Sequence, residues 1–246
     1  MAVDPIHQFQ IIDLFPVAKI GNFEIAFTNS AAFMLLAAVL LTVFLIAGTA
    51  GGKLVPTRLQ SAAELTYEFV ADMLRSTAGH EGMRFFPFVF TIFMFVLLLN
   101  VFGIIPYAFT VTSHIIITAV LALTVFFTVL LYGLYRHGLH FFNLFVPKGV
   151  PVYILPMIVA IEILSFISRP VSHSVRLFAN MLAGHILILT FLGLMFILES
   201  VVLAVAVVPV GIIFYLFEVI IVVGIQAFIF AALSAIYIGS AIEPEH

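Results

Sequence analysis

A fixed positive charge lies within an apolar stretch of this sequence. The segment SRPVSHSVRLFANMLAGH, residues 168–185, contains Arg176 and Arg169, and LFANMLAGHILILTFLGLMFIL follows Arg176 directly. At mid-membrane an arginine costs about 2.5–3.5 kcal/mol even on a lenient insertion scale, so an anionic partner or a water-filled cavity must offset it. Glu162 lies about 21 Å away along a helix that rises 1.5 Å per residue. We therefore expect the partner of Arg176 on another helix or another chain, whereas Arg169, beside Pro170, can equally be an edge residue that reaches water.

The polar residues around Arg176 fall on one side of a helix. With 3.6 residues per turn, His185 lies about 180° from Arg176, on the opposite face. Ala179 and Ala183 are four residues apart, and small residues at that spacing let another helix approach closely. Positions 173, 180 and 187 are seven apart and predict a seam that faces a partner helix. The polar stripe, within about 60° of Arg176, comprises Glu162, Ser165, Arg169, Ser172, His173 and Asn180.

A second polar set interrupts IIFYLFEVIIVVGIQAFIFAALSAIYIGS, residues 212–240. Gln226 and Tyr237 are eleven apart and share a helix face. A carboxyl group in a membrane is more often part of a proton relay than of a packed bundle, so Glu218 is expected to pair with His185 if the two segments pack antiparallel. Asn100 and His114 flank a short connection between two apolar stretches, where either an interface role or a channel role remains open.

The composition excludes most other classes of protein. Of 246 residues, 64% are hydrophobic and 9% are charged, against roughly 25% charged in soluble domains. The chain is therefore expected to be an integral membrane protein. It has no cysteine, which excludes disulfides and cysteine metal sites. We find no nucleotide loop, zinc-helix motif or nucleophile elbow, so no catalytic site, cofactor, metal or nucleic-acid partner is expected.

Apolar stretches of about 20 residues predict spans at 30–48, 85–106 and 114–135. Residues 57–79 repeat apolar side chains at helical spacing between charges, which predicts an amphipathic helix on the membrane surface or on a partner. If the loop after the first span is cytoplasmic, six lysines and arginines lie inside and only Lys19 lies outside. The positive-inside tendency favours this orientation, with the N-terminus outside.

The last hundred residues leave two arrangements open. Regions 151–198 and 200–240 lack strong breaks, and a straight 45-residue helix would span about 68 Å, more than twice the ~30 Å hydrocarbon thickness. Each region is either two spans with a turn or one long, tilted helix. We expect three parts: an external segment 1–28, a part with the first span, the amphipathic helix and a hairpin at 29–150, and a long-helix part at 151–246.

RLFANMLAGHILI, with SRPVS upstream and IQAFIFAALSAIYI downstream, closely resembles subunit a of F-type ATP synthases along the whole chain. The resemblance implies an all-α membrane protein of about five to six helices whose two long C-terminal helices form a tilted hairpin. It implies a proton-translocating stator in a bacterial inner membrane. The implied partners are a rotor c-ring with a membrane carboxylate, b-type peripheral stalk subunits, indirectly a soluble ATPase head, and the lipid bilayer.

The resemblance also implies roles for individual positions. Arg176 would face the rotor, with Asn180 and Gln226 beside it. His185 and Glu218 would line the outer half-channel. The remaining positions that would line a half-channel are Glu162, Ser165, Ser172, His173, His114, Asn100 and Tyr237, of which Glu162, Ser165 and Ser172 belong to the inner path.

The sequence departs from the family pattern in two places. Gly103 stands where some bacterial members carry an aspartate. Eight residues, instead of seven, separate Glu218 from Gln226, which turns Glu218 by about 100° unless a π-bulge absorbs the extra residue. A secondary transporter and a structural anchor are the alternatives, but the halves show no internal repeat and an anchor would not need a buried arginine.

Overall fold

The computed structural model describes residues 10–20, 23–51, 55–105, 108–146, 151, 153–198 and 201–242. In this part of the chain, five helical stretches are long and apolar enough to cross a membrane. The predicted integral membrane protein built from helices is confirmed. The candidate site positions lie where these helices meet or on the outer face of one of them.

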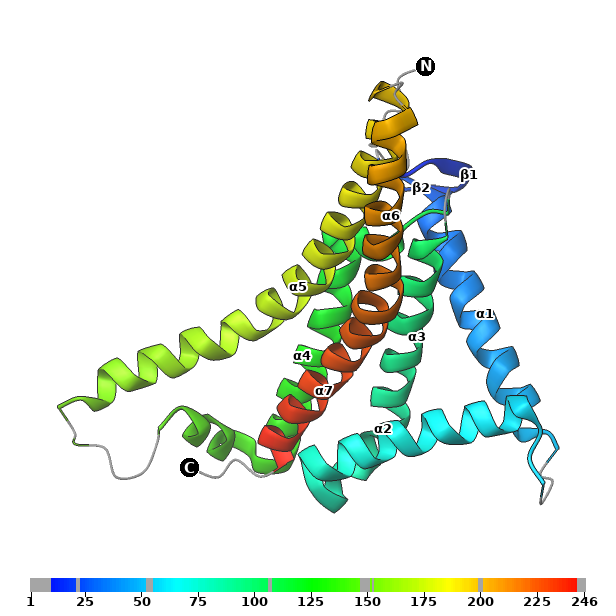
Figure 1. Ribbon diagram of the computed structural model, residues 1–246. Helices are drawn as coiled ribbons and strands as arrows, with labels where there is room; N and C mark the ends of the chain where they lie inside the picture. Colours follow the sequence, from blue (N-terminus) through cyan, green and yellow to red (C-terminus); the bar gives the residue numbers. More distant parts are fainter. Residues whose placement is uncertain are drawn as a thin grey trace.

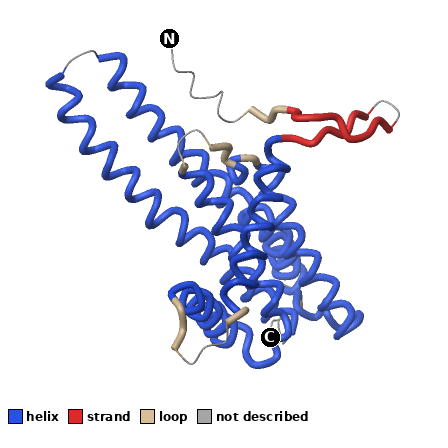
Figure 2. Tube along the Cα trace, turned by 90° about the vertical axis from the view of Figure 1, so that its right-hand side faces the viewer, coloured by secondary structure: helices blue, strands red, loops and turns tan. Residues whose placement is uncertain are grey.

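The N-terminal region adds an element that was not predicted. β1 (Asp13–Ile20) and β2 (Phe23–Thr28) pair antiparallel and project sideways from the upper end of the bundle (Figure 2). The side chain of Asn29 fixes the start of the first helix, since it accepts a hydrogen bond from the Ile12 amide and donates one to the Gln10 carbonyl. The hairpin thus continues directly into the membrane-spanning part.

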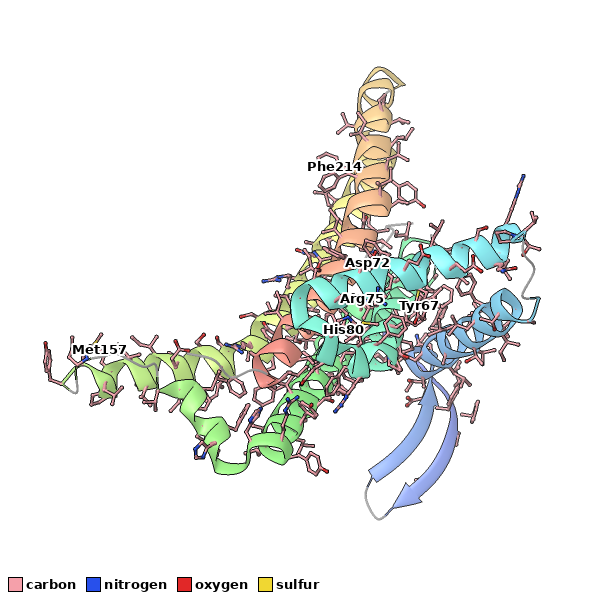
Figure 3. All side chains as sticks on the ribbon, turned by 90° about the horizontal axis from the view of Figure 1, so that it is seen from below. Tyr67, Asp72, Arg75, His80, Met157 and Phe214 are labelled. Carbon is pink, nitrogen blue, oxygen red and sulfur yellow. The ribbon has the colours of Figure 1, made fainter. Side chains whose placement is uncertain are left out.

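The first span and the surface helix follow the sequence prediction closely. α1 (Asn29–Thr49) begins after Thr28, whose hydroxyl accepts a hydrogen bond from the Ala31 amide. α2 (Arg58–Gly82) runs across the lower end of the bundle, at a steep angle to α1 (Figure 1). Seen from below, α2 turns charged residues such as Asp72 and Arg75 outward (Figure 3), while Val70 and Leu74 are fully buried. This amphipathic division is what a helix on a membrane surface requires.

A tight hairpin forms the centre of the bundle. The short 3-10 helix η2 (Met83–Phe85) leads into α3 (Phe86–Ile104), and η3 (Val111–Ser113) leads into α4 (Ile115–His137). η4 (Gly138–Phe145) follows α4. The core lies mainly between α3, α4 and the last helix, where Val89, Val96 and Ala231 are fully buried.

The two long C-terminal segments are single, nearly continuous helices. α5 (Leu155–Leu198) has 44 residues, about 66 Å of helix, and rises from the lower left of Figure 1 to the top. α6 (Val201–Phe217) returns antiparallel and passes through a π-helical segment, η5 (Glu218–Val222), into α7 (Val223–Ile242). Since this length exceeds the ~30 Å of hydrocarbon, α5 must cross at a tilt. The second of the two arrangements left open by the sequence is therefore the correct one.

Candidate functional site

The outer face of α5 carries the predicted polar stripe. Arg176, Asn180, Ser172 and Ser165 are all exposed, and Glu162 is half-buried. In the described chain, Arg176 makes no hydrogen bond or ion pair. The apolar side chains around it, including Val171, Val175, Ile186 and Leu187, are also exposed. This face therefore has no covering from the described helices of the same chain.

The inner face of α5 has the opposite character. His173, Leu177, Met181 and His185 follow one another at intervals of four residues, and all four are buried. A spacing of four keeps side chains on one side of a helix. The helix thus presents a polar, exposed face with Arg176 and a buried face that begins and ends with a histidine.

His185 pairs with Glu218, as expected for two antiparallel segments. Its Nδ1 lies 3.1 Å from Oε1 of Glu218, and both side chains are buried. Its Nε2 contacts the carbonyl oxygen of Gly103 on α3. Its Nδ1 also lies 3.2 Å from the carbonyl oxygen of Met181. If Nε2 donates a hydrogen bond to Gly103, Nδ1 can accept a proton from the carboxyl group of Glu218 or, once protonated, donate a hydrogen bond to the carboxylate. The pair can therefore hold one proton in two positions.

One glycine makes room for this pair, and another makes room for its neighbours. A Cβ atom on Gly184 would lie 2.5 Å from Oε1 of Glu218, whereas one on Gly103 would lie 2.9 Å from Cγ2 of Thr110 and 3.0 Å from Cε of Met181. Gly184 was not singled out in the sequence, because a glycine in a membrane helix does not reveal its neighbours. Gly103 contributes its backbone oxygen at the position where a carboxylate is absent.

The unusual spacing of Glu218 and Gln226 is absorbed by a π-helical segment that begins at Glu218. A π-turn accommodates one residue more than an α-turn. Glu218 therefore lies on the same helix face that a seven-residue spacing from Gln226 would give it. Gln226 itself is buried on α7, and Tyr237 is half-buried near its end.

Further buried polar groups surround the connection between α3 and α4. Asn100 is fully buried, and neither its amide nitrogen nor its amide oxygen has a partner in the described chain. The same holds for the Thr110 and Thr112 hydroxyls and for Nε2 of His114, whose ring stacks on Phe109. Buried polar atoms are almost always bonded to protein or to ordered water. This region near Gly103 is therefore suited to hold water.

The prediction that His173 belongs to the outward-facing seam is wrong. Its ring lies against Phe230 of α7, with centroids 3.8 Å apart, and its side chain is buried. His173 lies about 60° from Arg176 on the helix and Asn180 about 40°, so the packing of α7 sets the boundary of the exposed face between them. Arg169, one turn earlier, lies over the rings of Phe166 and Tyr237.

Comparisons with known proteins show the family of the chain. A family model described as ATP synthase A chain matches residues 31–239. The chain is 55% identical over 250 residues to ATP synthase subunit a of Rhodopseudomonas palustris (strain BisB5), with both chains fully covered. It is 57% identical over 248 residues, 99% of this chain and 100% of the relative, to ATP synthase subunit a of Nitrobacter winogradskyi. Because the family model and the relatives span nearly the whole chain, this protein belongs to the ATP synthase A chain family.

Proposed function

We propose that this chain is the proton-translocating stator subunit of a rotary ATP synthase. In this role it supplies two offset half-channels and a fixed positive charge opposite the carboxylate of a rotor ring. The observation that carries the proposal is the exposed guanidinium of Arg176, which has no partner in the described chain and stands on an uncovered face of a membrane helix. The burial cost of such a charge in a membrane requires an anionic partner, which a second chain would provide.

Arg176 acts in this mechanism as a countercharge and not as a proton carrier. Arginine does not deprotonate in proteins. A deprotonated rotor carboxylate is attracted to Arg176 and can pass through the interface, whereas a protonated carboxyl group is neutral and can turn out into lipid. The same positive charge repels a proton that would pass directly between the two half-channels. The driving force is about 2.3 kcal/mol per proton for each 100 mV.

The buried pair supplies the outer half-channel. His185 and Glu218 hold a proton between α5 and the π-helical segment, and the water-suited region around Asn100 and His114 connects the pair to the outer surface. Asn180 and Gln226 flank the point where the proton passes to the rotor. On the other side of Arg176, Glu162, Ser165 and Ser172 continue the exposed stripe and form the exit toward the inner surface.

The orientation follows from the charges of the loops. We place the β1–β2 hairpin and the N-terminus outside, and α2 at the cytoplasmic surface. The peripheral stalk and the rotor ring then surround the chain within a bacterial inner membrane, and the soluble head is coupled to it indirectly. The cytoplasmic charges in this orientation are Lys53, Arg58, Arg75, Arg84, Arg136 and Lys148, against Lys19 outside, as the positive-inside tendency favours.

The test replaces Arg176 in the assembled complex. Arg176→Ala should abolish ATP-driven proton pumping in inverted membrane vesicles while the complex still assembles. Arg176→Lys should also pump poorly, because lysine lacks the planar fork and can lose its proton when buried. Val175→Ala, on the same exposed part of α5, is the matched control and should pump normally. Normal pumping by Arg176→Ala would refute the proposal.

A further inference from the structure

A small pocket lies where α4, α5 and α7 meet. Its volume is about 10 Å³. Three polar side chains line it: Arg169 and His173 from α5 and Tyr237 from α7. The rest of the lining is Ala122, Val125, Phe126, Val129, Phe166 and Pro170. A cavity of this size is just large enough for one water molecule, which also needs two to four polar partners.

His173 contributes an unpaired atom to this space. The side chain is 3% exposed, and its Nε2 has no hydrogen-bond partner in the described chain. Phe230 covers one side of the ring, so the nitrogen cannot reach bulk water on that side. A buried nitrogen without a partner is costly, and ordered water is the usual remedy.

The other two polar groups are held in place around the cavity. The guanidinium carbon of Arg169 lies 5.2 Å from the Tyr237 ring centroid and 5.4 Å from that of Phe166. The rings of His173 and Tyr237 have centroids 6.0 Å apart. Cation–π contact fixes the arginine, and its N–H groups remain as donors beside an acceptor nitrogen and a hydroxyl group.

We propose that this cavity holds one water molecule bound by His173, Arg169 and Tyr237. The water accepts a hydrogen bond from Arg169, contacts the Tyr237 hydroxyl, and donates a hydrogen bond to Nε2 of a neutral His173. The inference rests on the proposed function in one respect, because it makes His173 a positioning residue that fixes the Tyr237 hydroxyl on the inner proton path.

The position of the cavity supports the inner assignment. His173 lies twelve residues before His185, about 18 Å earlier along α5, and α5 rises from the lower end of the molecule, where α2 lies, toward the top (Figure 1). Leu177 and Met181, both buried, lie between the two histidines on the same face. The water site is therefore separated from the His185–Glu218 pair by apolar packing and cannot belong to the outer half-channel.

The experiment measures passive proton conduction in vesicles that contain the complete membrane sector after removal of the soluble head. His173→Leu removes the acceptor and should lower conduction about fivefold, the effect of one lost hydrogen bond on a rate. His173→Gln keeps a polar group of similar reach and should retain most of the conduction that His173→Leu loses. Val125→Ile fills the cavity with one more carbon and should reproduce the loss. Val120→Ile, the same change on an exposed position of α4, is the control and should conduct normally.

A high-resolution structure of the wild-type complex gives the second readout. Density for a water within hydrogen-bond distance of Nε2 is expected in the wild type and should be absent in His173→Leu. An empty cavity in the wild type overturns the proposal, as does normal conduction by both His173→Leu and Val125→Ile. If these variants conduct normally while Arg176→Ala is inactive, only the water site fails. If Arg176→Ala pumps normally, the proposed function itself fails.

Discussion

The imidazole of His185 on α5 lies 3.1 Å from the carboxyl group of Glu218 at the start of the π-helical segment. The two residues are 33 positions apart in sequence and meet only because α5 and α6 pack antiparallel. Both side chains are buried. Glu218 has His185 beside its carboxyl group, whereas His185 also contacts the backbone carbonyls of Met181 and Gly103. The pair is therefore the most direct target for testing the outer proton path.

Replacing both partners should block entry of protons without disturbing the rotor interface. The Glu218→Leu, His185→Leu double variant removes both titratable groups and leaves no unpaired buried charge, which is the costly outcome of single replacement. Passive proton conduction of stripped vesicles should fall by at least about a hundredfold, the lower end of the range for loss of a positioned acid or base. Copurification of the rotor ring should be unchanged.

A shape-preserving variant separates titration from packing in the same assay. Glu218→Gln keeps the volume and a hydrogen-bonding group, but an amide group does not take up or release a proton as a carboxyl group does. Conduction should fall as far as in the double variant. Wild-type conduction in Glu218→Gln would show that the carboxyl group serves packing alone.

Gly184 should prove as sensitive as the pair that it borders. Gly184→Ala places a Cβ atom 2.5 Å from the present position of Glu218 Oε1, so the carboxyl group must move away from His185. Proton conduction should drop severalfold although the alanine itself favours the helix. Gly224→Ala is the matched control, because nothing lies within 4 Å of its Cβ position.

A double-mutant cycle gives this prediction its sharpest form. In a background with Glu218→Leu, adding Gly184→Ala should change conduction little, since the group that it displaces is already gone. Additive losses would mean that Gly184 acts through packing of α5 and not through Glu218.

The π-helical segment should be needed only to absorb the extra residue between Glu218 and Gln226. Deleting Ile220, whose side chain is 70% exposed, would leave a seven-residue spacing and let residues 218–223 continue as a regular α-helix. Glu218 should then keep its face toward His185. Conduction of the deletion variant should therefore stay close to that of Ile220→Ala, which keeps the length and should conduct normally. A deletion variant whose conduction falls to the level of Glu218→Leu would contradict this role of the π-turn.

Much of the fold could be predicted because hydrophobicity in a membrane is a strong signal. Runs of about 20 apolar residues located α1, α3 and α4 to within a few residues. The long C-terminal helices could not be distinguished from pairs of shorter spans by hydropathy, because length alone does not fix tilt. The β1–β2 hairpin was missed, since its mixed sequence with Pro16 gives no clear alternation of polar and apolar residues.

The sequence predicted the contact between His185 and Glu218 better than it predicted which side chains of α5 are exposed. His185 and Glu218 were expected together because titratable groups are rare in this sequence, and the structure confirms their contact. The π-turn at Glu218 was foreseen as the condition for that role and is present. His173 was assigned to the wrong face because a helical wheel gives angles but not the boundary that a neighbouring helix imposes. The surroundings of Arg169 and Gly184 became clear only from residues on other elements, Tyr237 on α7 and Glu218 on η5.

Cross-linking tests which face of α5 meets the rotor. Asn180, Ala183 and Leu187 lie within about 40° of Arg176 on the helix, and all four residues are exposed. The chain has no native cysteine, so single cysteines can be introduced without background.

Cysteines at 180, 183 and 187 should form disulfides with cysteines around the rotor carboxylate under mild oxidation. A disulfide needs Cα atoms within about 7 Å, which a close helix contact at this small-residue face would allow. Cysteines at 173 and 177 should remain reduced, because these positions are buried against the chain's own helices. Cross-links at 173 and 177 without any at 180 or 187 would mean that α5 is rotated in the complex. Arg176 would then point away from the ring, and the burial cost of its charge would need a different partner.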